Sequence, residues 1–169
     1  MKMNKKRNII LSIIVALTVC GVFGVYKYKE VQKEREQQTL NQIEMWFDEL
    51  DEISEMYNSF DEGYYFSVDE REEFRSLKEY TKELRREIEK YNVEDFSRKE
   101  EYELMINNLI VATKEFEEGI DDYLNYKTTY NYDKFDEHSN HMDKYNDLFN
   151  KIEDFIYDNE VEETEIKEF

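Results

Sequence analysis

After residue 38, hydrophobic residues recur every three or four positions, which is the spacing of one face of an α-helix. Short polar or turn-forming stretches at 61–66, 92–96 and 127–131 divide the pattern into four runs. The apolar positions of the four runs are Leu40, Ile43, Phe47, Leu50, Ile53, Tyr57 and Phe60; Phe74, Leu77, Thr81, Leu84, Ile88 and Tyr91; Tyr102, Met105, Leu109, Ala112, Phe116, Ile120 and Tyr123; and Phe135, His138, Met142, Tyr145, Phe149, Ile152 and Ile156. Connections of this length make successive helices antiparallel neighbours. The pattern therefore predicts an all-α fold, an antiparallel up-down bundle of three to four long helices.

Two helix starts carry the signature of a capping box, in which a serine and a glutamate three residues later satisfy each other's backbone N–H groups. These pairs are Ser67 with Glu70 and Ser97 with Glu100. The acidic segment 159–169 is expected to fray rather than to continue the last helix.

The first thirty residues predict a membrane anchor. Residues 9–25 form an uncharged run of about 17 residues behind four basic residues, and a membrane-spanning helix needs about 17–25. Tyr26 and Tyr28 suit the membrane interface, because the ring is apolar and the hydroxyl is hydrated. We therefore expect a basic tail at 1–8, a transmembrane anchor at 9–26 and a charged helical stalk at 27–38. The acidic bundle at 39–158 and the acidic tail at 159–169 follow.

Two alternatives for the N-terminal run stay open. Leu17-Thr18-Val19-Cys20 resembles the lipobox of bacterial lipoproteins, which would make Cys20 a lipid attachment point. The departures are Val19, where a smaller residue is usual, and the apolar residues after Cys20. In the other alternative, Val19 and Gly21 provide the small residues of an ordinary signal cleavage site.

Charge divides the chain into two parts. Residues 1–35 carry 8 basic and 2 acidic residues, whereas residues 36–169 carry 15 basic and 40 acidic residues, a net charge of −25. Such a body repels phosphate, so we expect no nucleic-acid partner. Acidic residues weigh little in the positive-inside rule, so the body can cross the membrane, and we expect it outside the cytoplasm. The single cysteine excludes an intramolecular disulfide.

Catalytic and metal-binding motifs are sparse. His138 and His141 share a helix face near Glu137, which gives a weak alternative for a transition-metal site. Glu117, Glu118, Asp121 and Asp122 surround Gly119 and could attract calcium or act as an acid–base pair. The simpler interpretation places His138 at the core edge, His141 in solvent and the four carboxylates on a solvated face. We therefore expect no enzyme, no cofactor and no metal site.

Aromatic residues provide the remaining candidate contacts. The 61–66 and 127–132 connections both lie at the end of the bundle far from the membrane. They carry Tyr64, Tyr65, Phe66, Tyr130 and Tyr132, and exposed aromatic rings on loops suit protein recognition. We predict a membrane-anchored interaction or scaffold module at the bacterial cell envelope. Its expected partner is another envelope protein. The alternative is a sequestering or immunity-type factor that binds cations or cationic peptides through its negative charge.

Overall fold

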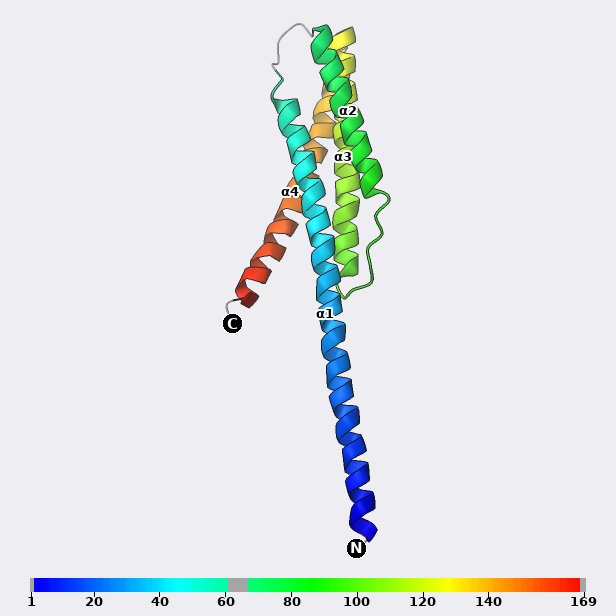
Figure 1. Ribbon diagram of the computed structural model, residues 1–169. Helices are drawn as coiled ribbons and strands as arrows, with labels where there is room; N and C mark the ends of the chain where they lie inside the picture. The colour runs from blue at the N-terminus through cyan, green and yellow to red at the C-terminus, as the bar shows by residue number, and fades with distance from the viewer. Residues whose placement is uncertain (1, 61–66, 168–169) are drawn as a thin grey trace.

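The structure is a computed structural model in which every regular element of the described part of the chain is a helix. The backbone is described for residues 2–60 and 67–167, and the side chains for residues 23–60 and 67–159. The helices are α1 (Lys2–Asn58), α2 (Val68–Ile88), α3 (Lys99–Thr129) and α4 (Tyr132–Lys167). The predicted all-α class and helical bundle are confirmed (Figure 1).

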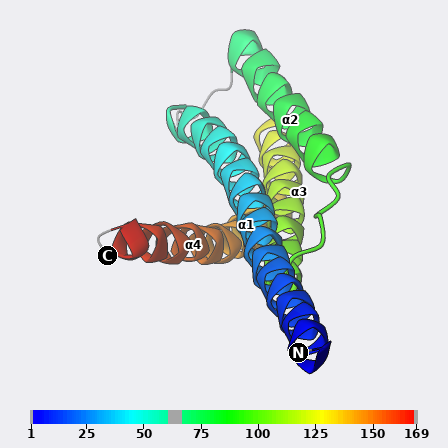
Figure 2. The ribbon, with the colours of Figure 1, turned by 60° about the horizontal axis from the view of Figure 1, so that its bottom comes forward.

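The four helices run alternately up and down, as predicted (Figure 1). The connection between α2 and α3 spans residues 89–98 and is longer than the predicted 92–96. Both α1 and α3 contact all three other helices, and the most extensive contact is between α3 and α4. Figure 2 shows α4 inclined steeply to α1, so that its C-terminal end leads away from the other helices.

The core is built from the predicted helix faces, with three corrections, the first of which is that Ile106 is buried where Met105 was expected. Its buried hydrophobic side chains within the helices are Leu40, Ile43, Trp46, Leu50 and Ile53 of α1; Phe74, Leu77, Leu84 and Ile88 of α2; Tyr102, Ile106, Leu109, Ala112, Phe116 and Ile120 of α3; and Tyr145 and Ile152 of α4. Trp46, 1% exposed, takes the central place expected of Phe47, which is only partly buried. Phe135 is exposed because it lines an open hollow at the end of the bundle.

The first predicted capping box is confirmed. The Ser67 hydroxyl accepts a hydrogen bond from the backbone N–H of Glu70 at 3.1 Å, and the Ser67 N–H donates to the Glu70 carboxylate at 2.6 Å. These bonds satisfy two N–H groups that have no partner inside the helix. They also hold the pKa of Glu70 below its usual value, because the hydrogen bond from the Ser67 backbone favours the charged carboxylate.

The second predicted capping box, Ser97 with Glu100, is wrong. α3 begins at Lys99 with Arg98 as its N-cap, and no side-chain hydrogen bond caps it. The guanidinium of Arg98 instead pairs with Glu101, with Glu36 of α1 and with Asn159 of α4. Tertiary contacts that involve three helices therefore decide where α3 starts.

The connection between α3 and α4 is shorter than predicted. α3 continues to Thr129, and only Tyr130 and Asn131 separate it from α4. Tyr130 adopts the left-handed conformation at φ 55° and donates its N–H to the Tyr126 carbonyl at 2.7 Å, which closes the last turn. At the other end, α4 extends to Lys167, so the expected fraying of residues 159–169 is wrong as far as that residue.

The N-terminal half of α1 extends beyond the bundle as an unbroken helix (Figure 1). Within the described residues, no helix is both long enough and apolar enough to cross a membrane. The side chains of residues 9–22, which make up most of the predicted anchor and include Cys20, lie outside the described residues.

Candidate functional site

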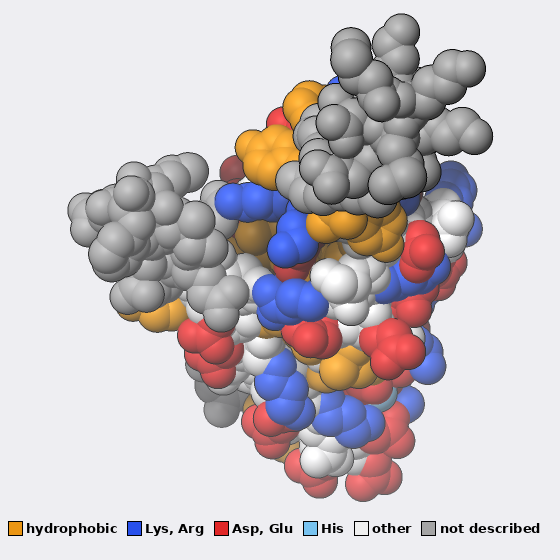
Figure 3. Space-filling view, turned by 90° about the horizontal axis from the view of Figure 1, so that it is seen from below, with side chains coloured by type: hydrophobic (Ala, Val, Ile, Leu, Met, Phe, Trp, Pro, Cys, Tyr) orange, Lys and Arg blue, Asp and Glu red, His pale blue; other side chains and the backbone are white. Residues whose placement is uncertain are grey.

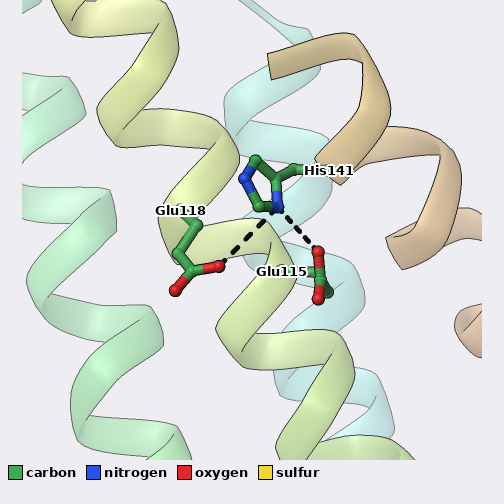
Figure 4. A group of neighbouring side chains, drawn as sticks. All are labelled: Glu115, Glu118 and His141. Atoms are coloured by element: carbon green, nitrogen blue, oxygen red, sulfur yellow. Dashed lines mark hydrogen bonds and ion pairs between the residues drawn. The ribbon is translucent and has the colours of Figure 1, made fainter. Parts of the chain in front are cut away.

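A histidine and two glutamates meet where α3 and α4 pack together (Figure 4). Glu115 and Glu118 lie one turn apart on α3, and His141 faces them from α4. The Nδ1 atom of His141 is 2.7 Å from Glu115 Oε2 and 3.7 Å from Glu118 Oε2. One nitrogen and two carboxylate oxygens therefore point towards a common space.

Gly119 of α3 faces α4 at this level. A Cβ atom at position 119 would lie 3.1 Å from the sulfur of Met142 and 3.5 Å from the Cβ of His141. The two helices therefore pack closely here, and a side chain at position 119 would require the Met142 sulfur to move by a few tenths of an ångström.

Further charged residues surround Glu115, Glu118 and His141. Nε2 of His141 lies 3.6 Å from Asp122 Oδ2, and Asp122 is paired with Lys134 at 3.1 Å. Lys78 of α2 binds Asp121, and Arg85 of α2 binds Glu117 at 2.9 Å. The expectation of a solvated acidic face is therefore wrong for Glu117 and Asp122, whereas the side chains of Glu118 and Asp121 are 44% and 51% exposed. Glu117 and Asp122 are mostly buried, and basic residues of α2 and α4 pair with the acidic group.

This charged region contains a hollow of about 370 Å³ at the junction of α2, α3 and α4. It is lined by Lys78, Glu117, Glu118, Asp121, Asp122, Lys134, Glu137 and His141. The Glu118 side chain, 44% exposed, leaves the Glu115–Glu118–His141 group open to solutes.

The protonation state of Glu115 reflects these neighbours. Burial by itself would raise the pKa of this carboxyl group, but the hydrogen bond from His141 and the nearby Lys144 ammonium outweigh it. The net result is a pKa below the usual value, so Glu115 stays ionised at neutral pH.

The two histidines have different surroundings. His138 is buried, as expected; its Nδ1 is 2.9 Å from the Gly119 carbonyl and its Nε2 is 3.1 Å from the Tyr57 hydroxyl. Burial lowers the pKa of His138, because the apolar surroundings disfavour its charged form. His141 was expected in solvent, but its side chain is only 21% exposed and both ring nitrogens face carboxylates.

The predicted aromatic tip is described only in part. Tyr130 and Tyr132 are 58% and 72% exposed, whereas Tyr64, Tyr65 and Phe66 lie outside the described residues. A hollow of about 340 Å³ lies at this end of the bundle. It is lined by Tyr57, Asn58, Phe60, Phe74, Tyr123, Tyr126, Lys127, Phe135, His138 and Ser139. The aromatic contact surface remains a prediction.

Sequence reasoning missed Glu115 and the junction between α3 and α4. It paired His141 with His138 and Glu137 on its own helix, and it grouped the α3 carboxylates around Gly119. A usable signal was the spacing of three residues between Glu115 and Glu118, which places both on one face of a helix. Only packing reveals that this face meets His141.

Comparison with known proteins assigns no family to the chain. No family model, no curated protein and no solved structure matches it. A function for this protein must therefore be argued from its residues and their geometry.

Proposed function

We propose that the protein is a membrane-tethered helical bundle that presents a protein-interaction surface outside the cytoplasm. The observation that carries this proposal is the apolar segment of α1 beyond the bundle. Phe23, Val25, Tyr26 and Tyr28 are 59–67% exposed there. Large exposed apolar surfaces mark contact with a membrane or a partner, and this one continues an uncharged run that reaches back to Ile9.

Continuity of α1 supports the tether. The helix passes from the apolar run through the stalk into the core without a break. The upper part of the stalk is braced, because Arg35 pairs with Glu94 and donates to the Asp95 carbonyl, and Gln32 donates to the same carbonyl. A rigid helix braced in this way would hold the bundle at a fixed distance from the bilayer surface.

The charge distribution supports a bundle that stands clear of the bilayer surface. Lys27, Lys29 and Lys33 lie next to the apolar run, where they can meet anionic headgroups, and the net charge of −25 belongs to residues 36–169. On the face of the bundle seen from the N-terminal end, basic side chains are interspersed with acidic ones (Figure 3). This mixture favours a water-exposed surface above the membrane over a body that lies flat on it.

The interaction surface that we assign is the far end of the bundle. Tyr130 and Tyr132 are exposed beside the aromatic-lined hollow described above. Tyrosine is enriched at protein interfaces, because its ring buries apolar area and its hydroxyl forms hydrogen bonds. The role that these exposed rings support is therefore one of binding a partner protein.

The tether is tested by fractionating bacteria that express the full chain. We expect the intact chain, still beginning at Met1, in carbonate-washed membranes, with its bundle removed by protease added to cells with a permeabilised outer layer. Ile14→Arg with Ala16→Arg should release it, because each arginine at the centre of a span costs about 2.5–3.5 kcal/mol. The control is Val68→Arg, which adds a charge at a position that is 73% exposed on the bundle.

Each alternative for the N-terminal segment gives a different outcome. Lipidation requires a mass increase at Cys20 that Cys20→Ser abolishes, and cleavage releases a chain that starts near residue 21. Either outcome would contradict the uncleaved anchor.

Electrostatic sequestration is the second candidate function, favoured by the net charge of −25 over residues 36–169. Charge-driven capture of a cationic peptide should weaken steeply with added salt, because salt screens exposed charges. Binding at the aromatic tip should persist in salt and be lost in Tyr130→Ala with Tyr132→Ala. Measuring binding at increasing salt concentration, for the unsubstituted chain and for the double tyrosine variant, separates the two functions.

A further inference from the structure

We propose that Glu115, Glu118 and His141 form a binding site for one divalent transition-metal ion of the zinc class, which links α3 to α4. This site is independent of the membrane tether and of the aromatic tip. It takes three protein ligands and leaves a coordination position open towards the hollow between α2, α3 and α4.

The ligand atoms are suitably spaced. Zinc binds imidazole nitrogen at about 2.0–2.1 Å and carboxylate oxygen at about 2.0–2.2 Å, so tetrahedral ligand atoms lie about 3.4 Å apart. Nδ1 of His141 is 2.7 Å from one glutamate oxygen and 3.7 Å from the other, and all three ligand atoms lie within 4.8 Å of one another. Side-chain shifts of about one ångström or less would place an ion among them.

Chemistry favours zinc or a similar ion over calcium. An imidazole nitrogen with two carboxylates suits zinc and its neighbours, whereas calcium takes six to eight oxygen ligands. Asp122 lies 3.6 Å from the other ring nitrogen of His141, just beyond hydrogen-bond distance. A small shift would let it accept the N–H of that nitrogen, as carboxylates beside metal-binding histidines do. Asp122 is itself held by Lys134, which fixes the carboxylate that would orient the imidazole.

The cations that now pair with the two glutamates are exposed and able to move away. Lys144 is 3.4 Å from Glu115 with its side chain 60% exposed, and Lys114 is 3.7 Å from Glu118 with its side chain 53% exposed. Both distances exceed about 3.2 Å and both lysine side chains are solvated, so these pairs are weak and an ion can displace the two ammonium groups. Lys78, Arg85 and Lys134 would meanwhile keep neutralising the surrounding carboxylates.

The pair of histidines gives the experiment an internal reference. Both ring nitrogens of His138 are engaged inside the core, by the Gly119 carbonyl and the Tyr57 hydroxyl. The full chain, labelled on histidine and purified in detergent without metal, is titrated with Zn²⁺ while its imidazole resonances are recorded. We expect one equivalent of Zn²⁺ to shift the His141 signals and to leave those of His138 in place.

Variants separate a built site from general attraction to negative charge. Glu115→Gln with Glu118→Gln should weaken Zn²⁺ binding by more than about 10-fold, and Asp122→Asn should weaken it by about 10-fold. The matched control is Glu100→Gln with Glu103→Gln, which removes two carboxylates with the same spacing from the exposed start of α3. Repeating the titration on Cys20→Ser excludes the thiol as the ligand, and Ca²⁺ at the same concentration should leave His141 unshifted.

Three results would overturn the proposal. They are an unshifted His141 at one equivalent of Zn²⁺, equal weakening in the control pair, and an equal response to Ca²⁺. Circular dichroism of every variant establishes that the bundle remains folded, so that lost binding reports on the ligands themselves.

Discussion

At the scale of single residues, polar groups inside the bundle hold the helices in register. Tyr57 shows this best, because its ring contacts Phe74, Phe116 and Tyr123 while its hydroxyl meets His138. One side chain of α1 thus touches all three other helices. The neutral form of His138 fits this arrangement, since it can donate to the Gly119 carbonyl and accept from the Tyr57 hydroxyl.

His138 should make stability depend on pH in mildly acidic solution. Its pKa is lowered in the folded state from an ordinary value of 6.5, so the unfolded chain binds the proton first. Its contribution is therefore fully present above pH 6.5 and is lost as the pH falls through the folded pKa. Urea unfolding at about pH 7 and about pH 5 should show this loss. His138→Gln should flatten the difference, and an equally steep difference in that variant would assign the effect to other groups.

At the scale of helices, the hydrogen bonds at helix ends show which capping-box sequences form a cap in the folded protein. Ser67 and Ser97 have the same sequence signature, but only Ser67 caps a helix. At the second site Arg98 occupies the N-cap position and makes contacts outside its own helix. A local capping sequence therefore indicates a possible helix start, and the contacts with other helices determine whether the cap forms.

The two serines form a matched test of that conclusion. Ser67→Ala should lower the free energy of unfolding by about 1 kcal/mol, because the Glu70 N–H loses its acceptor. Ser97→Ala should change the free energy of unfolding by less than about 0.5 kcal/mol. Chemical denaturation followed by circular dichroism measures both, and equal losses would mean that Ser97 caps α3 in solution.

At the scale of the whole molecule, Arg98 links α1, α3 and α4 at the end of the bundle next to the stalk. Its guanidinium pairs with Glu36 of α1 at 3.2 Å, with Glu101 of α3 at 2.7 Å and with Asn159 of α4 at 2.8 Å. These bonds connect α1 to α3 and α4 at the position where α1 leaves the bundle and continues as the stalk. Their energy is limited by solvent, because the Arg98 side chain is 34% exposed.

Removing this junction should loosen the base of the bundle. Arg98→Ala is expected to destabilise the protein by about 1 kcal/mol and to speed hydrogen exchange near Asn159 and Glu36. Arg75→Ala, an exposed arginine of α2, serves as the matched control and should do neither. Fast exchange in both variants, or in neither, would contradict the role of Arg98 as a junction.

The candidate site shows why part of the molecule was unpredictable. The helix faces were readable because burying a stripe of apolar residues is a local periodic requirement, which Ile43, Leu84, Leu109 and Ile152 all satisfy. The approach of Glu115 to His141 was not readable. It joins residues on two helices, and it depends on how those helices are rotated and spaced where they pack.

The sequence by itself determined the helical class, the alternating direction of the helices and the division between a basic start and an acidic body. Periodicity, the absence of proline and the distribution of charge are properties of the chain alone. Only the tertiary structure decided that Trp46 lies in the core, that α3 begins after Arg98 without a serine cap, and that Glu115, Glu118 and His141 meet. Those outcomes depend on the relative rotation and separation of packed helices, which spacing within one helix does not specify.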